Sequence, residues 1–174
     1  ISMYLTGATL RPGKTSPGLQ GMWCRENFPA WSADFHGNIN IQAIYQQVLG
    51  SNHPELFEPY AALYDGMRPQ CERDTASYFG CAGVRYPHAG SIDGHELTEP
   101  NYLALAISFM PSSWIARLYW WYYTHTGDRE YLRSVGYPVL RDVARFYRGI
   151  LEKTGLDADG RCRVEPSIWG EHHA

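Results

Sequence analysis

Two short polar segments near opposite ends of the chain hold the residues that could do chemistry. Residues 29–40 (PAWSADFHGNIN) combine aromatic rings, a carboxylate, an imidazole and two side-chain amides. A hydrophobic core needs no such mixture, whereas a sugar-binding pocket uses aromatic faces for stacking and polar groups for the hydroxyls. Residues 166–171 (PSIWGE) place the carboxyl of Glu171 among apolar neighbours. Together the two segments predict a site that cleaves glycosidic bonds.

The composition is that of an ordinary globular chain of 174 residues, with 44% hydrophobic and 19% charged residues. This length is sufficient for one domain with a hydrophobic core. The net charge is −3 and the Lys and Arg residues are scattered singly. No basic stripe is present to neutralise phosphates, so no nucleic-acid partner is expected. Apolar runs such as residues 103–107 are far shorter than the roughly 20 residues of a spanning helix, so no membrane partner is expected either.

Aromatic residues and cysteines leave alternatives open. The 13 Tyr and 6 Trp combine a flat apolar face with a polar edge, which suits stacking on sugar rings. Outside residues 23–36 we expect most of them to fill a helical core instead. The four cysteines show no C-x-x-C spacing, so a zinc site is not expected and buried free thiols are the default. A Cys71–Cys81 disulfide is the alternative if the protein is exported.

Helices are expected to position the two polar segments. The residues before Phe35 contain many glycines and prolines and predict a loop. Apolar residues at helical spacing predict a helix over residues 38–49, with Asn38 or Asn40 as its N-cap. Gly50 is expected just past its end.

The middle of the chain predicts a second helix followed by a long loop. This helix should begin at Pro54 or Pro59, because proline fits a first helical turn. It should be interrupted by Pro69, with helical character resuming over residues 70–79. Residues 80–98 are rich in glycine and polar residues and predict a long loop.

The second half of the chain predicts a helical hairpin. Ser112 or Ser113 is expected to cap a long helix that ends at the Thr-Gly-Asp turn of residues 126–128. Pro138 should open a further helix, which Gly155 ends. Helices joined by short turns predict an all-α protein made of successive hairpins.

These motifs resemble the catalytic domain of glycoside hydrolase family 95, the inverting α-L-fucosidases. The matching segments, in the family's order, are residues 11–13 (RPG), 19–23 (LQGMW), 29–31 (PAW) with 34–40 (DFHGNIN), 80–83 (GCAG) with His88, 114–132 ending in TGDREYL with residues 137–138 (YP), and 166–167 (PS) with Glu171. The resemblance covers most of the chain. Its amino-terminal part is the more specific, since Thr-Gly-Asp before a helix occurs in many helical glycosidases.

The resemblance implies an all-α fold, an (α/α)6 barrel, of which residues 1–174 would be an incomplete N-terminal half with long loops. This implies one partial catalytic domain, truncated at the C-terminus and at the N-terminus, whose partner is the remaining half of its own barrel. Half a barrel exposes the apolar face of its inner helices, so we expect the isolated chain to be poorly stable, prone to association and inactive. Family members are commonly exported, which implies an extracellular or periplasmic location.

The resemblance also implies catalytic roles. Glu171 would be the general acid that protonates the departing glycosidic oxygen, and its apolar neighbours favour a carboxyl that keeps its proton near neutrality. Asn38 and Asn40 would position the attacking water with the help of a downstream Asp, because an amide has no basicity of its own. Inversion requires about 6.5–9.5 Å between the two catalytic groups. No cofactor and no metal is implied.

Four further residues are expected to bind the sugar through ring stacking and hydroxyl bonds: Trp31, Asp34, His36 and His88. Two departures from the family pattern bear on which sugar that is. Residues 87–93 (PHAGSID) stand where the family typically has His-His-Asn-Thr-Asp, and residues 44–47 (IYQQ) stand where many members have Asn-Tyr-Trp-Pro. The expected substrate is therefore a glycan that ends in α-linked L-fucose or in a related sugar such as galactose.

Three other interpretations stay open at this point. A non-catalytic carbohydrate-binding relative would keep the pocket but lack an Asp shortly after residue 174. Metal chemistry has six available side chains: His88, Asp93, His95, Glu96, His172 and His173. No two of these six side chains have the i, i+4 spacing of a zinc hydrolase motif. A purely structural helical domain accounts for residues 110–152 but leaves residues 29–40 unexplained.

Overall fold

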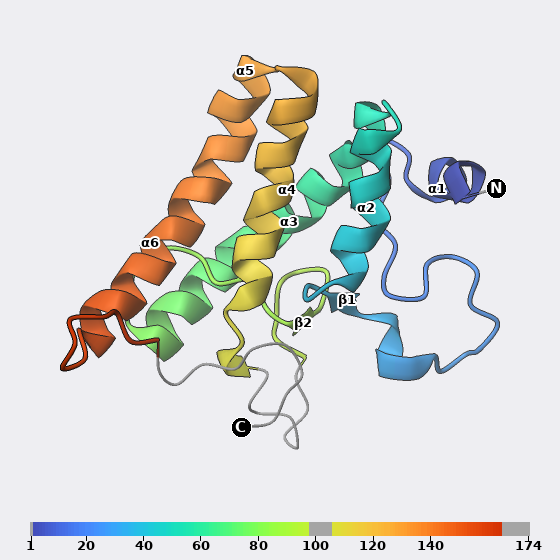
Figure 1. Ribbon diagram of the computed structural model, residues 1–174. Helices are drawn as coiled ribbons and strands as arrows, with labels where there is room; N and C mark the ends of the chain where they lie inside the picture. Colours follow the sequence, from blue (N-terminus) through green and yellow to red (C-terminus); the bar gives the residue numbers. More distant parts are fainter. Residues whose placement is uncertain (1, 98–105, 165–174) are drawn as a thin grey trace.

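The computed structural model describes residues 2–97 and 106–164 (Figure 1). Its helices are α1 (Ser2–Thr9), α2 (Asn40–Gly50), α3 (Glu58–Asp74), α4 (Met110–Thr126), α5 (Arg129–Tyr131) and α6 (Tyr137–Thr154). Shorter 3-10 or π segments are η1 (Ala30–Ala33), η2 (Pro54–Phe57), η3 (Thr75–Phe79) and η5 (Leu132–Gly136). Strands β1 (Phe35–His36) and β2 (Ala89–Gly90) form one small antiparallel pair. The all-α class is confirmed, with this pair added.

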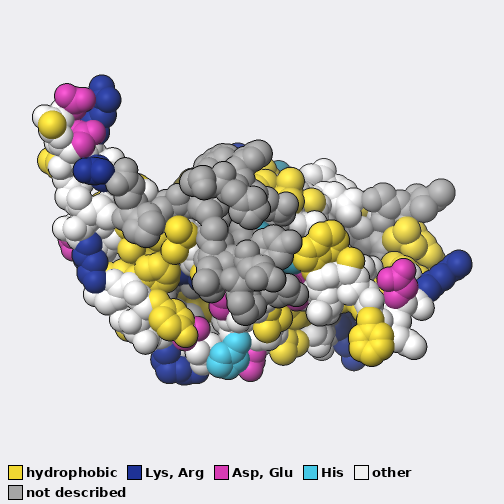
Figure 2. All heavy atoms as spheres, turned by 90° about the horizontal axis from the view of Figure 1, so that it is seen from below, with side chains coloured by type: hydrophobic (Ala, Val, Ile, Leu, Met, Phe, Trp, Pro, Cys, Tyr) yellow, Lys and Arg dark blue, Asp and Glu magenta, His cyan; other side chains and the backbone are white. Residues whose placement is uncertain are grey.

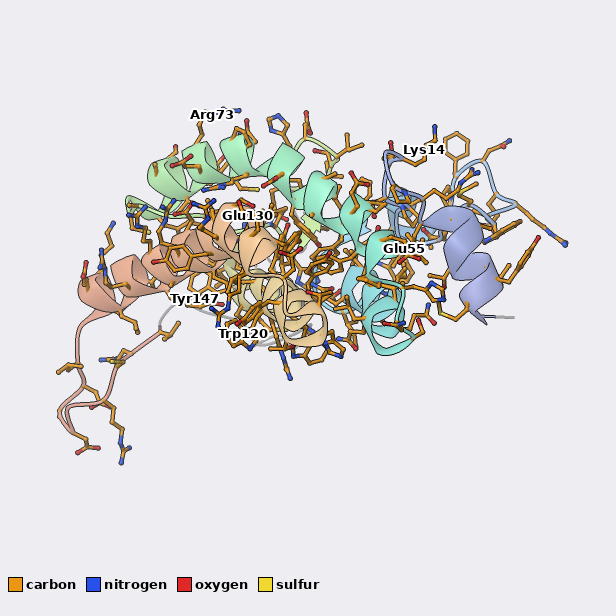
Figure 3. All side chains as sticks on the ribbon, turned by 90° about the horizontal axis from the view of Figure 1, so that it is seen from above. Lys14, Glu55, Arg73, Trp120, Glu130 and Tyr147 are labelled. Carbon is orange, nitrogen blue, oxygen red and sulfur yellow. The ribbon has the colours of Figure 1, made fainter. Side chains whose placement is uncertain are left out.

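The long helices form a packed group around α4. Figure 1 shows α4 and α6 side by side in opposite directions, with α2 on the other side of α4 and α3 behind them. Helix α4 ends at the Thr-Gly-Asp turn, as expected, and the carboxylate of Asp128 caps α5 by accepting a hydrogen bond from the backbone N–H of Tyr131 at 2.9 Å. Helix α6 ends before Gly155, also as expected. Seen from above, charged side chains such as Lys14 and Arg73 point away from this group (Figure 3).

Aromatic rings fill the space between the helices. Tyr45 on α2, Tyr60 and Tyr64 on α3 and Tyr119 on α4 are buried. The ring centroids of Tyr45 and Tyr60 are 4.9 Å apart, and those of Tyr60 and Tyr64 are 4.7 Å apart. Such pairs contribute about 0.5–1.5 kcal/mol beyond the burial of their area. The core interpretation of the tyrosines is therefore confirmed for these four.

Pro69 does not interrupt α3, contrary to the expectation from sequence. The helix runs through it, and η3 follows directly. Pro69 lies on the exposed side of the helix together with Asp65, whose carbonyl loses its intrahelical partner. Water can reach that carbonyl, while the buried side chains of Met67 and Cys71 hold the helix on both sides of the proline. Tertiary packing thus overrides the local signal.

The loop expected before Phe35 begins with a helix, α1, so that part of the expectation was wrong. Contacts with α2 stabilise it: the side-chain amide of Gln47 donates to the hydroxyl of Thr6 at 2.7 Å. Leu10, directly after the helix, is fully buried. Such long-range contacts are what stabilise a short helix that contains a glycine, here Gly7.

The expected serine and asparagine caps were also wrong. Helix α4 begins at Met110, and the hydroxyl of Ser112 instead accepts a hydrogen bond from the backbone N–H of Tyr86 at 2.9 Å. Helix α2 begins at Asn40, its N-cap position is Ile39 with no side-chain cap, and Gly50 is its last residue. Ser112 thus bonds a distant segment instead of capping its helix, whereas the side-chain oxygen of Asn38 accepts a hydrogen bond from the neighbouring N–H of Ile39.

A buried carboxylate ties α6 to α3. Asp142 on α6 pairs with Arg68 on α3, with Arg141 at 2.8 Å and with Arg145 at 3.3 Å. Burial disfavours the charged carboxyl, but the hydrogen bond from Arg141 and the charge of Arg68 outweigh it, so the pKa of Asp142 is lowered. Its backbone carbonyl also accepts a hydrogen bond from the N–H of Val84, which anchors the long loop to α6.

The four cysteines are free thiols. Cys71 is buried, and burial raises the pKa of its thiol to about 12. Cys24 and Cys162 are exposed, so the buried default fails for these two. The alternative Cys71–Cys81 disulfide is not formed. None of the helices in the described residues is long and apolar enough to cross a membrane.

Candidate active site

The candidate site forms where residues 29–40 meet the loop that follows α3. His36 in β1 lies opposite Ala89 in β2, and the backbone N–H of Gly37 donates to the carbonyl of His88 at 2.8 Å. A Cβ atom on Gly37 would lie 2.9 Å from the carbonyl oxygen of Pro87, so this close approach requires glycine. Figure 1 shows the strand pair at the end of α2 where that helix begins. The pairing brings two distant parts of the chain together.

Three of the predicted substrate-binding rings meet at this point. The ring centroids of His36 and His88 are 5.8 Å apart at an interplanar angle of 77°. The indole of Trp31 lies edge-on to His36, with 6.3 Å between the centroids. The carboxylate of Asp34 is hydrogen-bonded to Nδ1 of His36. The side chain of Asp34 is only 8% exposed and that of His36 only 10%. The structure therefore brings Trp31, Asp34, His36 and His88 together.

The turn that carries this cluster is strained. Trp31, Ser32 and Ala33 have φ values of 51°, 54° and 51°, in the left-handed region that residues other than glycine rarely adopt. Each such residue costs on the order of 1–3 kcal/mol and persists only where its surroundings hold it, and such strain clusters at functional sites. The consequence here is an indole that stands out from the surface, since Trp31 is 69% exposed.

The preceding loop holds the strained turn in place. The backbone N–H of Leu19 donates to the carbonyl of Asp34 at 2.9 Å, and the amide of Gln20 donates to the carbonyl of Ala30 at 2.7 Å. Gly18 makes this possible, because a Cβ atom there would lie 2.0 Å from the carbonyl oxygen of Ala33. Residues 18–20 thus act as a brace on the turn.

The two asparagines lie next to the cluster, at the start of α2. Asn38 is buried, and its side-chain oxygen accepts a hydrogen bond from the backbone N–H of Ile39 at 2.8 Å. Asn40 is the first residue of α2 and is half-buried. A carbonyl oxygen has two lone pairs, so the oxygen of Asn38 can also accept a hydrogen bond from water. Glu171, the expected acid, lies outside the described residues.

Gln42 contacts the backbone of the candidate site, and sequence reasoning missed it. It is fully buried, and its amide donates to the carbonyl of Gly37 at 2.6 Å, directly between His36 and Asn38 in the chain. The signal was a polar residue on the otherwise apolar buried side of the helix, next to Ile41. Gln42 connects α2 to the backbone that positions the imidazole and the amide.

The side chains considered for a metal site are dispersed. His88 lies against His36, whereas Asp93 and His95 are exposed. Glu96 pairs with Arg85 at 2.7 Å, at the wall of a cavity of about 240 Å3. Within residues 2–97 and 106–164, no three His, Cys, Asp or Glu side chains gather as a metal site would require. His172 and His173 lie outside the described residues.

Large hydrophobic side chains are exposed along the segment that leads into the site. Met22, Trp23, Phe28 and Trp31 are each at least 60% exposed. Figure 2 shows hydrophobic side chains in separate groups over the lower face of the molecule. The aromatic residues of residues 22–31 therefore differ from the tyrosines of the core, and they are available for contact with a ligand.

Comparison with known proteins identifies relatives of the whole chain. A "Probable alpha-fucosidase A" of Aspergillus niger is 28% identical over 170 residues, which are 97% of this chain and 21% of the relative. An "Alpha-L-fucosidase 2" of Arabidopsis thaliana is 29% identical over 169 residues, which are 97% of this chain and 20% of the relative. The chain spans about a fifth of the length of these two relatives.

A third relative and a family profile complete the comparison. A "Kojibiose hydrolase" of Flavobacterium johnsoniae is 32% identical over 101 residues, which are 58% of this chain and 15% of the relative. The profile described as "Glycosyl hydrolase family 95 catalytic domain" matches residues 1–174. Since that profile matches the chain from its first residue to its last, the protein belongs to the catalytic domain of glycosyl hydrolase family 95.

Proposed function

We propose that this chain is part of a glycoside hydrolase that cleaves terminal α-linked L-fucose, or a related sugar such as galactose, with inversion. The observation that carries the proposal is the cluster in which Asp34 and His36, just before Asn38 and Asn40 in the chain, meet His88 from a distant loop. A buried carboxylate–imidazole pair beside an exposed indole and two amides suits the recognition of a sugar ring and its hydroxyls. Family membership and the relatives named as fucosidases support the same function.

Catalysis is proposed to use Glu171 as the general acid. The oxygen of a water molecule attacks the anomeric carbon, the bond from that carbon to the glycosidic oxygen breaks, and Glu171 gives its proton to the departing oxygen. The side-chain oxygens of Asn38 and Asn40 accept hydrogen bonds from the water and orient it. Because amides are not bases, the proton of the water passes to an Asp supplied from beyond residue 174. In such a mechanism the acid and the base lie about 6.5–9.5 Å apart.

Substrate binding is proposed to use the cluster of Trp31, His36 and His88, in which the carboxylate of Asp34 is hydrogen-bonded to His36. The indole of Trp31 would stack on the apolar face of the sugar, since the indole is exposed and lies beside His36. The imidazoles would bond the hydroxyls. The proposal includes the remaining half of an (α/α)6 barrel as the structural partner and an extracellular or periplasmic location, both implied by the family resemblance.

The test is turnover of aryl α-L-fucosides and aryl α-galactosides, together with natural glycans, by the natural protein that contains these residues. Glu171→Gln should abolish turnover of natural glycans and keep part of the activity toward aryl glycosides with good leaving groups, which need no protonation. Asn38→Gly should lower kcat. The matched controls are Glu72→Gln on the exposed side of α3 and Asn52→Gly in an exposed turn, which should leave both rates unchanged.

The outcomes separate the proposal from its rival. Cleavage of one of the two sugars, lost in Glu171→Gln as described, supports the proposal and identifies the sugar. A well-folded protein that binds sugar but cleaves none of these glycosides would contradict it and favour a non-catalytic carbohydrate-binding relative.

A further inference from the structure

Asp34 was expected to bond a sugar hydroxyl, but its carboxylate is already engaged. One oxygen is bonded to Nδ1 of His36, and only 8% of the Asp34 side chain is exposed. The indole that lies beside the same imidazole is 69% exposed, whereas the His36 side chain is only 10% exposed, so Trp31 is the open member of the cluster. The carboxylate contacts the imidazole at Nδ1, which leaves the opposite ring nitrogen, Nε2, outside this contact.

This arrangement determines which nitrogen of the imidazole carries the proton. In a neutral imidazole one ring nitrogen donates and the other accepts, and the hydrogen bond made by one nitrogen sets the role of the other. A carboxylate can only accept, so Nδ1 of His36 must carry the hydrogen. In the neutral ring Nε2, across from Nδ1, is then an acceptor that suits the hydrogen of a hydroxyl group.

Contacts from other segments hold the imidazole and its partner carboxylate in place. His88 lies edge-on against His36 at 5.8 Å, and β1 is paired with β2 through the backbone of the same residue. The backbone of Asp34 is held by the N–H of Leu19. The carboxylate and the imidazole are therefore positioned independently of any ligand, which lowers the entropic cost of binding one.

We infer that Asp34 is a positioning residue that acts through His36, holding its Nδ1–H so that Nε2 accepts a hydrogen bond from a sugar hydroxyl. The inference rests on the proposed function and refines it. It reassigns Asp34 from the sugar to the imidazole, and it requires a free hydroxyl on the bound sugar at the position that faces Nε2.

The experiment is a double-mutant cycle in the natural full-length protein with Asp34→Asn, His36→Ala and the combined variant. The readouts are the dissociation constants of L-fucose and D-galactose, KM and kcat for the aryl glycosides, and the melting temperature. Asp93→Asn is the matched control, because Asp93 precedes His95 with the same spacing but lies in solvent.

With His36 present, Asp34→Asn should weaken sugar binding on the order of tenfold. An amide can also donate to Nδ1, which allows the tautomer with its hydrogen on Nε2, and that tautomer cannot accept the hydroxyl hydrogen. KM should rise while kcat changes little, since a ground-state contact is lost. In the His36→Ala background the same substitution should have no effect on binding. Asp93→Asn should leave binding and turnover unchanged.

An equal loss of binding in both backgrounds would overturn the inference, because Asp34 would then act on the sugar directly or on the fold as a whole. A fall in melting temperature without any change in the dissociation constant or KM would overturn it as well. If the unsubstituted protein neither binds nor cleaves these sugars, the proposed function itself fails. If the unsubstituted protein binds or cleaves these sugars but the effects of the two substitutions simply add, the proposed function stands. Only the role assigned to Asp34 is then rejected.

Discussion

The chain contains two Asp-x-His pairs of identical spacing, and they lie in opposite environments. The side chains of Asp34 and His36 are 8% and 10% exposed, whereas those of Asp93 and His95 are 66% and 58% exposed. In the first pair the carboxylate is bonded to Nδ1 of the imidazole; in the second it lies 3.7 Å from Nε2. The same local sequence pattern thus produces a bonded pair in one place and a loose surface contact in the other.

The difference comes from what surrounds each pair. Around Asp34, the brace of residues 18–20, the strained turn and the strand pairing exclude water, and a hydrogen bond is stronger in such a low-dielectric environment. Asp93 has the hydroxyl of Ser91 as a hydrogen-bond donor, which lowers the pKa of its carboxyl, but water screens its attraction to His95. Spacing therefore identifies a possible pair, and only burial makes it a fixed one.

The largest expected effect comes from breaking the brace. Gly18→Ala places a methyl group 2.0 Å from the carbonyl oxygen of Ala33, so the turn that carries Asp34 must move. We expect a destabilisation of about 1–3 kcal/mol and loss of sugar binding, measured by thermal melting and by titration with L-fucose and D-galactose. Gly7→Ala is the control, because a Cβ there meets nothing and alanine favours the helix. Retained sugar affinity in Gly18→Ala would show that the buried pair does not depend on the brace.

An intermediate effect is expected at a second buried carboxylate, whose partners are arginines rather than histidine. Asp142→Asn should destabilise the protein by about 2 kcal/mol at pH 7, since it leaves Arg68 without its charged partner. The pKa of Asp142 is lowered in the folded protein. Its contribution is therefore complete above the unfolded value of about 3.9 and disappears as the pH falls through the lower folded value.

The measurement for Asp142 is the difference in melting temperature between the unsubstituted and variant proteins from pH 7 down to pH 3. The difference should stay constant to about pH 4 and shrink below it. Glu130→Gln, which breaks the exposed pair with Arg133, should change the melting temperature at none of these pH values. A difference that persists undiminished far below pH 4 would contradict the assigned charge state.

The smallest effect is expected at Trp31, the exposed member of the buried cluster. Trp31→Ala should weaken binding of the matching monosaccharide by up to about tenfold, through loss of stacking, and leave the melting temperature nearly unchanged. Trp120→Ala is the matched control, because this half-exposed indole lies on α4 (Figure 3). Equal binding by both variants would show that the indole beside His36 has no part in sugar recognition.

The regular parts of the fold were predictable because they depend on local pattern. In α6 the buried residues Val139, Val143, Phe146 and Ile150 recur every three or four positions, which is the signature of a one-sided helix. The cap of Asp128 was predictable for the same reason. The continuation of α3 through Pro69 was not, since it depends on which side of the helix faces water.

The sequence by itself determined the family, the all-α class and the set of residues available for chemistry, because motifs and helical periodicity are written in neighbouring positions. Only the tertiary structure decided that His36 meets His88, that Gln42 joins the site, and that Asp34 is buried while Asp93 is exposed. Strand pairing and burial arise from contacts between residues far apart in the chain. The Asp-x-His spacing therefore does not by itself predict a buried hydrogen-bonded pair, because the surrounding segments decide whether the two side chains are buried.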